Sequence, residues 1–150
     1  MVHSSLRRRD FKRIGGRETL FVTRDFEIAA FGPANLFNIS DQVKDVVGKS
    51  NVRNGFVALL SIGSTGALTR LTEDAHEDFV EWVRTNLPFD SSHRHPGNAF
   101  AHLRSSLIGC DLILPLRNGE ILGDLQSIVL LENTAGRKRR RISLVIVGEA

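Results

Sequence analysis

The chain lacks the sequence features by which many functional classes are identified. It has one cysteine among 150 residues, Cys110, so no internal disulfide can form. It contains no paired CxxC, no HExxH, no GxSxG nucleophile elbow and no glycine-rich dinucleotide fingerprint. These absences exclude a disulfide scaffold and give no support to the commonest hydrolase and dinucleotide-binding classes. A single cysteine is typical of a reducing compartment, so we expect a cytoplasmic protein.

Long apolar runs and tyrosine are also missing. The longest stretch without charge, residues 54–69, is rich in glycine and serine and too short to span a bilayer. The basic N-terminal residues are followed by further charge rather than by the apolar core of a signal peptide. The basic runs at 7–9 and 137–141 contain no interleaved aromatics, unlike a surface that binds single strands. We therefore expect no membrane and no nucleic-acid partner, and the basic runs are either solvated charge or part of an anion site.

Strand-like patterns dominate both ends of the chain. Short β-rich or apolar runs predict strands over 18–23, 26–31 and 55–62, and hairpins over 111–122 and 127–147. Asn118 and Gly119 supply the positive φ angles of a tight hairpin turn.

Helical patterns occupy the middle of the chain. Three helices are predicted, and their expected N-caps are Ser40, Thr72 and Asn98. The apolar stripe of the second helix comprises Ala75, Phe79, Trp82 and Val83.

The order of these elements predicts an α+β fold. The chain runs from strands to one helix, back to strands, then to two helices and finally to strands. This order is not the strand–helix alternation of a parallel doubly wound sheet. We expect a mainly antiparallel, sandwich-like β core with two to three helices packed on it. Residues 25–150 then form a single domain, and the basic residues 1–24 form an N-terminal extension that adds a strand.

The stretch HRHPGNAFAH, residues 93–102, holds three of the five histidines. His93 and His95 flank one residue, and His102 lies in the following predicted helix. Two or three imidazoles could converge there and hold a divalent metal such as zinc. The alternative is that the loop histidines are exposed to solvent and the helical histidine bonds a backbone group. The residues alone leave both interpretations open.

Several polar residues at predicted element ends suit an anion. Asn98 begins a helix, where free backbone N–H groups favour negative charge, and Ser105 lies further along the same helix. Ser64 and Thr65 follow the apolar strand in a hydroxyl-rich turn, which is not a Walker P-loop because its lysine is missing. Two further candidates are Gln126, just before an apolar strand, and Arg139, in the basic final strand. The alternative for each is a structural role as a turn, a strand end or an edge charge that resists aggregation.

Five short motifs in one order give the chain a family resemblance. They are NISDQV, SIGSTGALTRLTEDA, RHPGNAFAHLRSSLIG, LPLRNGEILGDLQSIVLLEN and GRKRRRISLVIV. Together they resemble the YjbQ-like family, which is described as secondary thiamine-phosphate synthases. The resemblance runs from about Asp25 to Val147. No single motif is specific, but their order is.

The resemblance implies an α+β fold, a homotrimer and a pocket near a subunit boundary that receives a small phosphorylated or anionic ligand. The implied catalytic residues are His95, His102 and Glu73. The implied ligand-binding residues are Ser64, Thr65, Asn98, Ser105, Gln126 and Arg139. A divalent metal such as zinc is the implied cofactor, with His95 and His102 as ligands and His93 as a third.

Two positions depart from the family pattern. Gly63 stands where the family has a histidine before its paired threonines, and Phe100 stands where it has an aspartate. Two functions therefore remain open. The first is weak thiamine-phosphate synthase activity, which joins a pyrimidine diphosphate to a thiazole phosphate. The second is non-catalytic binding of a small anionic metabolite by a trimer with a degenerate pocket.

Overall fold

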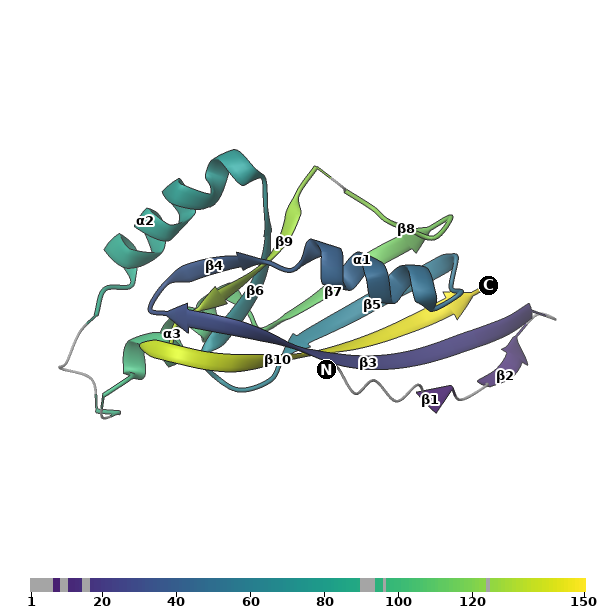
Figure 1. The fold of residues 1–150 in the computed structure, drawn as a ribbon, viewed down its shortest axis with the longest axis horizontal. Helices are drawn as coiled ribbons and strands as arrows, with labels where there is room; N and C mark the ends of the chain where they lie inside the picture. Colours follow the sequence, from purple (N-terminus) through teal and green to yellow (C-terminus); the bar gives the residue numbers. More distant parts are fainter. Residues whose placement is uncertain (1–6, 9–10, 15–16, 90–93, 96, 124) are drawn as a thin grey trace.

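The computed structural model describes residues 7–8, 11–14, 17–89, 94–95, 97–123 and 125–150. This described part contains two antiparallel sheets and three α-helices (Figure 1). The expected α+β fold with a mainly antiparallel β core is confirmed. None of the described helices has the length and apolar character needed to traverse a bilayer.

The larger sheet has seven strands, and β10 and β5 lie at its centre. In spatial order its strands are β1 (Arg7–Arg8), β3 (Arg17–Gly32), β10 (Gly136–Glu149), β5 (Asn54–Ser61), β7 (Asp111–Arg117) and β8 (Glu120–Ile121), and β2 (Phe11–Ile14) also pairs with β3. β10 is antiparallel to β3 along its whole length, from Gly136 opposite Gly32 to Glu149 opposite Thr19. Segments from the two ends of the chain therefore lie side by side in this sheet (Figure 1).

The smaller sheet has three strands and carries the connections to the helices. Its order is β4 (Asn35–Asn38), β9 (Ser127–Glu132) and β6 (Gly66–Leu71). The helical elements are α1 (Ser40–Lys49), the 3-10 turn η1 (Glu73–Ala75), α2 (His76–Asn86) and α3 (Ala99–Ile108). β6 leads into η1 and α2, and both α2 and α3 adjoin the smaller sheet, where α2 contacts β4 and α3 contacts β6 (Figure 1).

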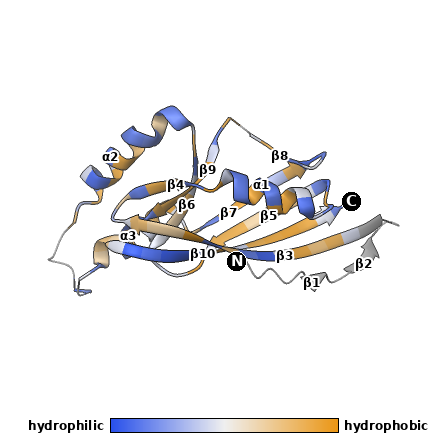
Figure 2. Ribbon diagram, in the orientation of Figure 1, coloured by the Kyte–Doolittle hydropathy of each residue, from blue (hydrophilic) through white to orange (hydrophobic). Residues whose placement is uncertain are grey.

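The main core joins the larger sheet to α1 and to the smaller sheet. Alternate residues of β10 are fully buried, namely Ile142, Leu144 and Ile146, as the two-residue period of a strand requires. Val43 and Val47 of α1 belong to the same cluster. Figure 2 shows hydrophobic central strands beside a helix that alternates hydrophilic and hydrophobic residues. A second cluster of Ala34, Ala67, Val83 and Leu131 joins the smaller sheet to α2.

The expected hairpin over 127–147 is wrong, because its two strands belong to different sheets. β9 pairs with β4 and β6, whereas β10 pairs with β3 and β5. β10 forms a ladder with β3 over all 14 of its residues, which is more than the six-residue β9 could offer in a hairpin. The chain therefore changes sheets between Glu132 and Gly136.

The first helix does not use Ser40 as its N-cap. The cap position is Ile39, and Ser40 is the first helical residue. The Ser40 hydroxyl instead accepts a 2.9 Å hydrogen bond from the backbone N–H of Ile128 in β9, while Asn38 Oδ1 accepts from Ser40 N at 2.9 Å. The serine therefore joins α1 to the smaller sheet, a long-range contact that local sequence rules do not describe.

Two further predictions from the sequence differ from the structure, and a third is confirmed. The strands expected over 18–23 and 26–31 are one strand, β3, because β10 supplies a continuous partner along it. Trp82 is 54% exposed and does not share the buried stripe of Val83. The turn at Asn118 and Gly119 is confirmed, with φ angles of 55° and 84°.

Candidate functional site

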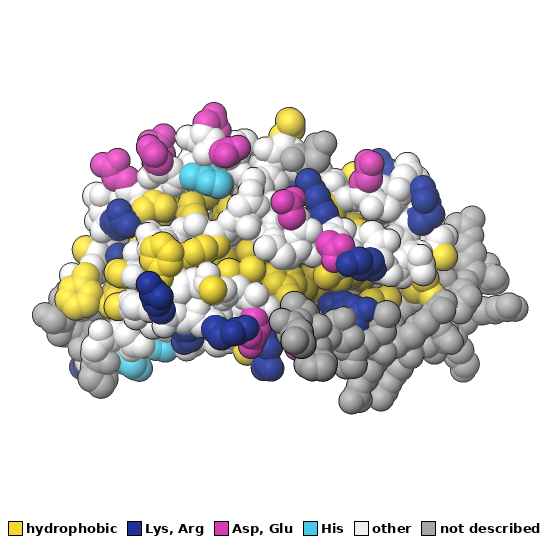
Figure 3. Space-filling view, viewed as in Figure 1, with side chains coloured by type: hydrophobic (Ala, Val, Ile, Leu, Met, Phe, Trp, Pro, Cys, Tyr) yellow, Lys and Arg dark blue, Asp and Glu magenta, His cyan; other side chains and the backbone are white. Residues whose placement is uncertain are grey.

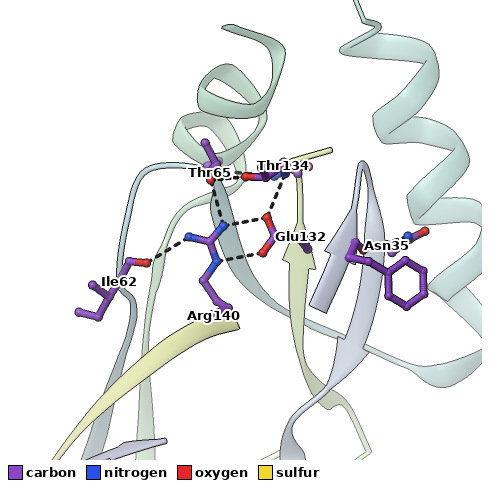
Figure 4. Close-up of polar contacts among 9 residues, drawn as sticks. Asn35, Ile62, Thr65, Glu132, Thr134 and Arg140 are labelled. Atoms are coloured by element: carbon purple, nitrogen blue, oxygen red, sulfur yellow. Dashed lines mark hydrogen bonds and ion pairs between the residues drawn. The ribbon is translucent and has the colours of Figure 1, made fainter. Parts of the chain in front are cut away.

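A buried ion pair lies at the corner where the two sheets diverge. Arg140 of β10 is 1% exposed, and Glu132 at the end of β9 is fully buried. Arg140 Nε donates to Glu132 Oε2 at 3.0 Å, and Arg140 Nη2 donates to Glu132 Oε1 at 2.7 Å (Figure 4). Two parallel bonds of this kind fix the carboxylate and guanidinium in one plane. The pair therefore ties the larger sheet to the smaller one.

The same guanidinium holds the turn between β5 and β6. Arg140 Nη1 donates to the carbonyl oxygen of Ile62 at 3.1 Å, and Arg140 Nη2 donates to Thr65 Oγ1 at 2.9 Å. Thr134 Oγ1 donates to Thr65 Oγ1 at 2.6 Å, and Thr134 N donates to Glu132 Oε1 at 2.9 Å (Figure 4). We call these five residues, Ile62, Thr65, Glu132, Thr134 and Arg140, the arginine clasp.

Strand alternation explains why Arg140 points inward. Ile142, Leu144 and Ile146 fill the core from even-numbered positions of β10, and Arg140 continues that series. Arg139, on the opposite face, is exposed and forms an ion pair with Glu27 at 2.7 Å. The expected ligand-binding arginine, Arg139, thus lies on the other face of the strand from the clasp.

The clasp is connected to α3 through Asn133. Its backbone N–H donates to the carbonyl oxygen of Thr65 at 3.1 Å, and its Nδ2 donates to Ser105 Oγ at 3.1 Å. Within the described residues, Asn133 Oδ1 and Ser61 Oγ are buried without a hydrogen-bond partner. Buried polar atoms of this kind normally find a partner, so this corner retains unused hydrogen-bonding capacity.

The two described loop and helix histidines lie beside each other. The ring centroids of His95 and His102 are 4.7 Å apart. His95 is exposed and His102 is half-buried. His102 lies three residues before Ser105 on α3, so the two share one helix face. His93 falls outside the described residues.

Helix α3 begins where the sequence predicted, but its N-cap side chain does not form the expected hydrogen bond. Asn98 is the N-cap, although its side chain makes no capping hydrogen bond, and Gly109 ends the helix with φ 104°. Two early amides of the helix, Ala101 N and His102 N, donate to the Asn98 carbonyl at 2.9 and 3.4 Å.

The predicted residues Glu73 and Gln126 lie at the other end of the smaller sheet. Leu71 of β6 pairs with Ser127 of β9, which places Gln126 beside the start of η1, where Glu73 is exposed. Thr65 adjoins the opposite end of β6. Six residues of strand separate the two ends by about 20 Å. Within one chain, Asn133 links Thr65 to Ser105, and His102 lies one helical turn before Ser105, whereas Glu73 and Gln126 lie apart from this corner.

The neighbourhood of α3 also contains a buried cation, Arg104. It is 3% exposed, its Nε donates to the carbonyl oxygen of Leu87 at 2.8 Å, and its guanidinium carbon lies 5.2 Å from the centre of the Phe100 ring. Burial, and then the nearby Arg84 guanidinium, lower the pKa of Arg104 below its usual value. Leu87 is the C-cap of α2, so Arg104 places positive charge at the negative end of that helix.

A groove along α2 has a different character. It has a volume of about 530 Å³, and its lining residues are Leu36, His76, Glu77, Val80, Glu81 and Arg84. Figure 3 shows acidic side chains gathered over α2, above an apolar strip. An acidic rim repels negative charge, so the corner of the arginine clasp is the better candidate for an anion.

The sequence prediction named Thr65 and Ser105, and it included Arg140 only as part of the basic run 137–141. It did not name Glu132, Asn133 or Thr134. The even-numbered series from Arg140 to Ile146 was the available signal for Arg140. Glu132 gave no local signal, because its burial depends on a contact between two sheets.

The fold and this corner define a small α+β protein with two antiparallel sheets and a buried polar turn. A family model for the UPF0047 YjbQ-like proteins matches residues 24–149. The chain belongs to this YjbQ-like family, as its motifs indicated.

Relatives and solved structures support this assignment. A UPF0047 protein of Archaeoglobus fulgidus is 32% identical over 114 residues, covering 71% of this chain and 87% of the relative. One of Methanothermobacter thermautotrophicus is 29% identical over 133 residues, covering 85% and 92%. The crystal structure of a "YbjQ-like protein of unknown function" from Sulfolobus solfataricus has a TM-score of 0.82 and 28% identity, covering 87% of this chain and 99% of that one.

Proposed function

We propose that this protein binds a small phosphorylated or otherwise anionic metabolite at the corner formed by the arginine clasp, His102 and the start of α3. The observation that carries the proposal is the polar corner itself. It combines a fixed guanidinium, the hydroxyls of Thr65 and Ser105 and a half-buried imidazole. Donors of these types recognise phosphate oxygens, and the buried Ser61 hydroxyl, which has no partner among the described residues, is a further donor.

Isothermal titration calorimetry with inorganic phosphate and diphosphate tests this function. Wild-type protein is expected to bind at least one of them, and His102→Ala is expected to weaken binding about tenfold, because a hydrogen bond to a charged group is lost. His76→Ala is the matched control, since His76 is also a half-buried helical histidine but lies in the groove along α2. Absence of binding to the wild type, or an equal loss in both variants, contradicts the proposal.

Thiamine-phosphate synthesis is the second candidate. The proximity of His95 and His102, with ring centroids 4.7 Å apart, favours it because a paired imidazole can hold or move a proton near a departing diphosphate. The expected reaction joins a pyrimidine diphosphate to a thiazole phosphate. Product formation by the wild type that disappears in His102→Ala supports catalysis, and phosphate binding without product supports the binding protein.

The implied metal fits the described residues only in part. His95 and His102 supply two imidazole nitrogens, whereas a stable zinc site takes three or four protein ligands. The described residues contain no group of three or more histidine, cysteine, aspartate or glutamate side chains placed to hold an ion. His93 lies outside that description. The proposed binding therefore assigns the contacts to the anion to protein groups alone.

We also propose that the protein acts as a homotrimer. The outer face of the larger sheet, away from α1, carries adjoining apolar side chains on β10, β5 and β7. Across the three strands, Phe56 pairs with Val147 on one side and with Pro115 on the other. Two residues further along β5, Ala58 pairs with Val145 and with Ile113. Phe56 and Ile113 are 40% and 68% exposed. Contiguous exposed apolar surface of this kind marks an interface.

Assembly also bears on the position of Glu73 and Gln126. These residues lie about 20 Å from the clasp within one chain, as the β6 ladder shows. If they act with His102, they come from a neighbouring copy.

A further inference from the structure

We propose that Arg140 is itself a ligand-binding residue, and that Gly63 is the opening through which its Nη1 reaches a terminal phosphate group. The inference rests on the proposed anion-binding function and names the residues that receive the anion. It assigns this role to Arg140, a buried member of the clasp, rather than to the exposed Arg139.

The hydrogen bonds of Arg140 leave one donor unassigned. A guanidinium has five N–H groups. Nε–H is used by Glu132, and the two on Nη2 are used by Glu132 and Thr65. One N–H of Nη1 is used by the Ile62 carbonyl. The second N–H of Nη1 has no partner among the hydrogen bonds of the described residues. Because the Arg140 side chain is 1% exposed, a ligand reaches this N–H only where the Gly63 turn gives way.

Gly63 determines whether that donor can be reached. Gly63 is exposed, and its φ of +107° is one that residues with a side chain rarely adopt. A Cβ at this position would lie 2.8 Å from Arg140 Nη1. Any residue other than glycine would therefore cover the nitrogen. With glycine, Nη1 lies directly beneath an exposed backbone.

Thr65 adds a second donor beside this opening. Its Oγ1 accepts from Arg140 Nη2 and from Thr134 Oγ1, which occupies both of its lone pairs. Where Thr134 Oγ1 is the donor, the hydroxyl hydrogen of Thr65 remains for a ligand. Ser64, the residue between Gly63 and Thr65, is exposed and carries a third hydroxyl.

The charge balance of the clasp limits what it can hold. Glu132 neutralises Arg140, and the carboxylate oxygens face Arg140 and Thr134 N rather than the opening. The opening thus offers directed donors without a large excess of positive charge. That arrangement suits one oxyanion group on a small molecule, held by hydrogen bonds, rather than a polyanion.

The test compares Gly63→Ala with Gly119→Ala in phosphate titrations of the full chain. Both glycines have positive φ, +107° and +84°, but only at Gly63 does an added Cβ meet another group within 4 Å. We expect Gly63→Ala to weaken phosphate binding about tenfold, because the Arg140 donor is covered, and Gly119→Ala to leave it unchanged.

The outcomes separate this inference from the proposed function. Binding that is equal in wild type and Gly63→Ala overturns the role of Arg140 and leaves the proposed function standing. Absence of phosphate binding to the wild type overturns both. If Gly63→Ala does not fold, ¹⁵N NMR of the wild type replaces it. Phosphate is then expected to shift the amides of Gly63, Ser64 and Thr65, and shifts confined to other residues overturn the inference.

Discussion

At the scale of single residues, two arginine–glutamate pairs in the described part of the chain differ in burial. Arg140 and Glu132 are both buried, whereas the side chains of Arg139 and Glu27 are 79% and 47% exposed. The two arginines are neighbours in β10 and face opposite sides of it. An exposed pair is screened by water, while a broken buried pair leaves an uncompensated charge. The comparison therefore isolates the effect of burial.

We expect Glu132→Gln to lower the free energy of unfolding by about 3–5 kcal/mol, because it leaves Arg140 buried and unpaired. Glu27→Gln, the matched control, is expected to change it by less than about 1 kcal/mol. Urea denaturation followed by circular dichroism measures both. Equal effects in the two variants would show that the clasp does not fix the corner between the sheets.

Gly63 illustrates what the sequence could and could not predict at this scale. The family motif marks position 63 as a departure, and a lost histidine suggests a decayed pocket. The structure shows instead that a Cβ there would lie 2.8 Å from Arg140 Nη1. The glycine and the arginine, 77 positions apart, are therefore fitted to each other. A histidine at position 63 would displace the clasp, because its Cβ would lie too close to Arg140 Nη1. It would also strain the backbone, which has φ +107° here.

At the scale of elements, most helices and strands follow from the periodicity of the sequence. The exceptions share one cause, which is contact with residues far away in the sequence. The tight turn of β7 and β8 was predicted because Asn118 and Gly119 are local signals. The partners of β9 and β10 were not predicted, because strand pairing between distant segments leaves no local trace. Ser40 is the same case, since its hydroxyl bonds Ile128 rather than its own helix.

Ser40→Ala distinguishes these two roles. We expect it to lower the free energy of unfolding by about 1–3 kcal/mol, because the buried N–H of Ile128 loses its acceptor. Hydrogen exchange should then accelerate at Ile128 but not at Gln42 and Val43, the amides that a capping serine would protect. Ser106→Ala, at an exposed position of α3, is the control and should change neither quantity. Acceleration at the helix start alone would contradict the assignment.

At the scale of the whole molecule, the uncovered apolar face of the larger sheet is where we propose that copies of the chain associate. Ile113 lies in β7, beside β5 in the apolar surface, and is 68% exposed. We expect Ile113→Glu to shift the protein from trimer towards monomer, because a charge buried in an interface is strongly unfavourable. Size-exclusion chromatography with light scattering measures the mass. Leu125→Glu is the control, since Leu125 is 86% exposed and lies in the segment before β9. An unchanged mass for Ile113→Glu would place the interface elsewhere.

The place of β10 between β3 and β5 also governs when the chain can fold. Thr19 pairs with Glu149, so the larger sheet joins the beginning of the chain to its last residues. A ribosome releases β3 and β5 long before β10, and the two strands then lack the partner that lies between them. The larger sheet can close only after β10 has also left the ribosome. Until then, the unpaired backbone N–H and C=O groups at the edges of both strands remain open to chaperones or to other nascent chains.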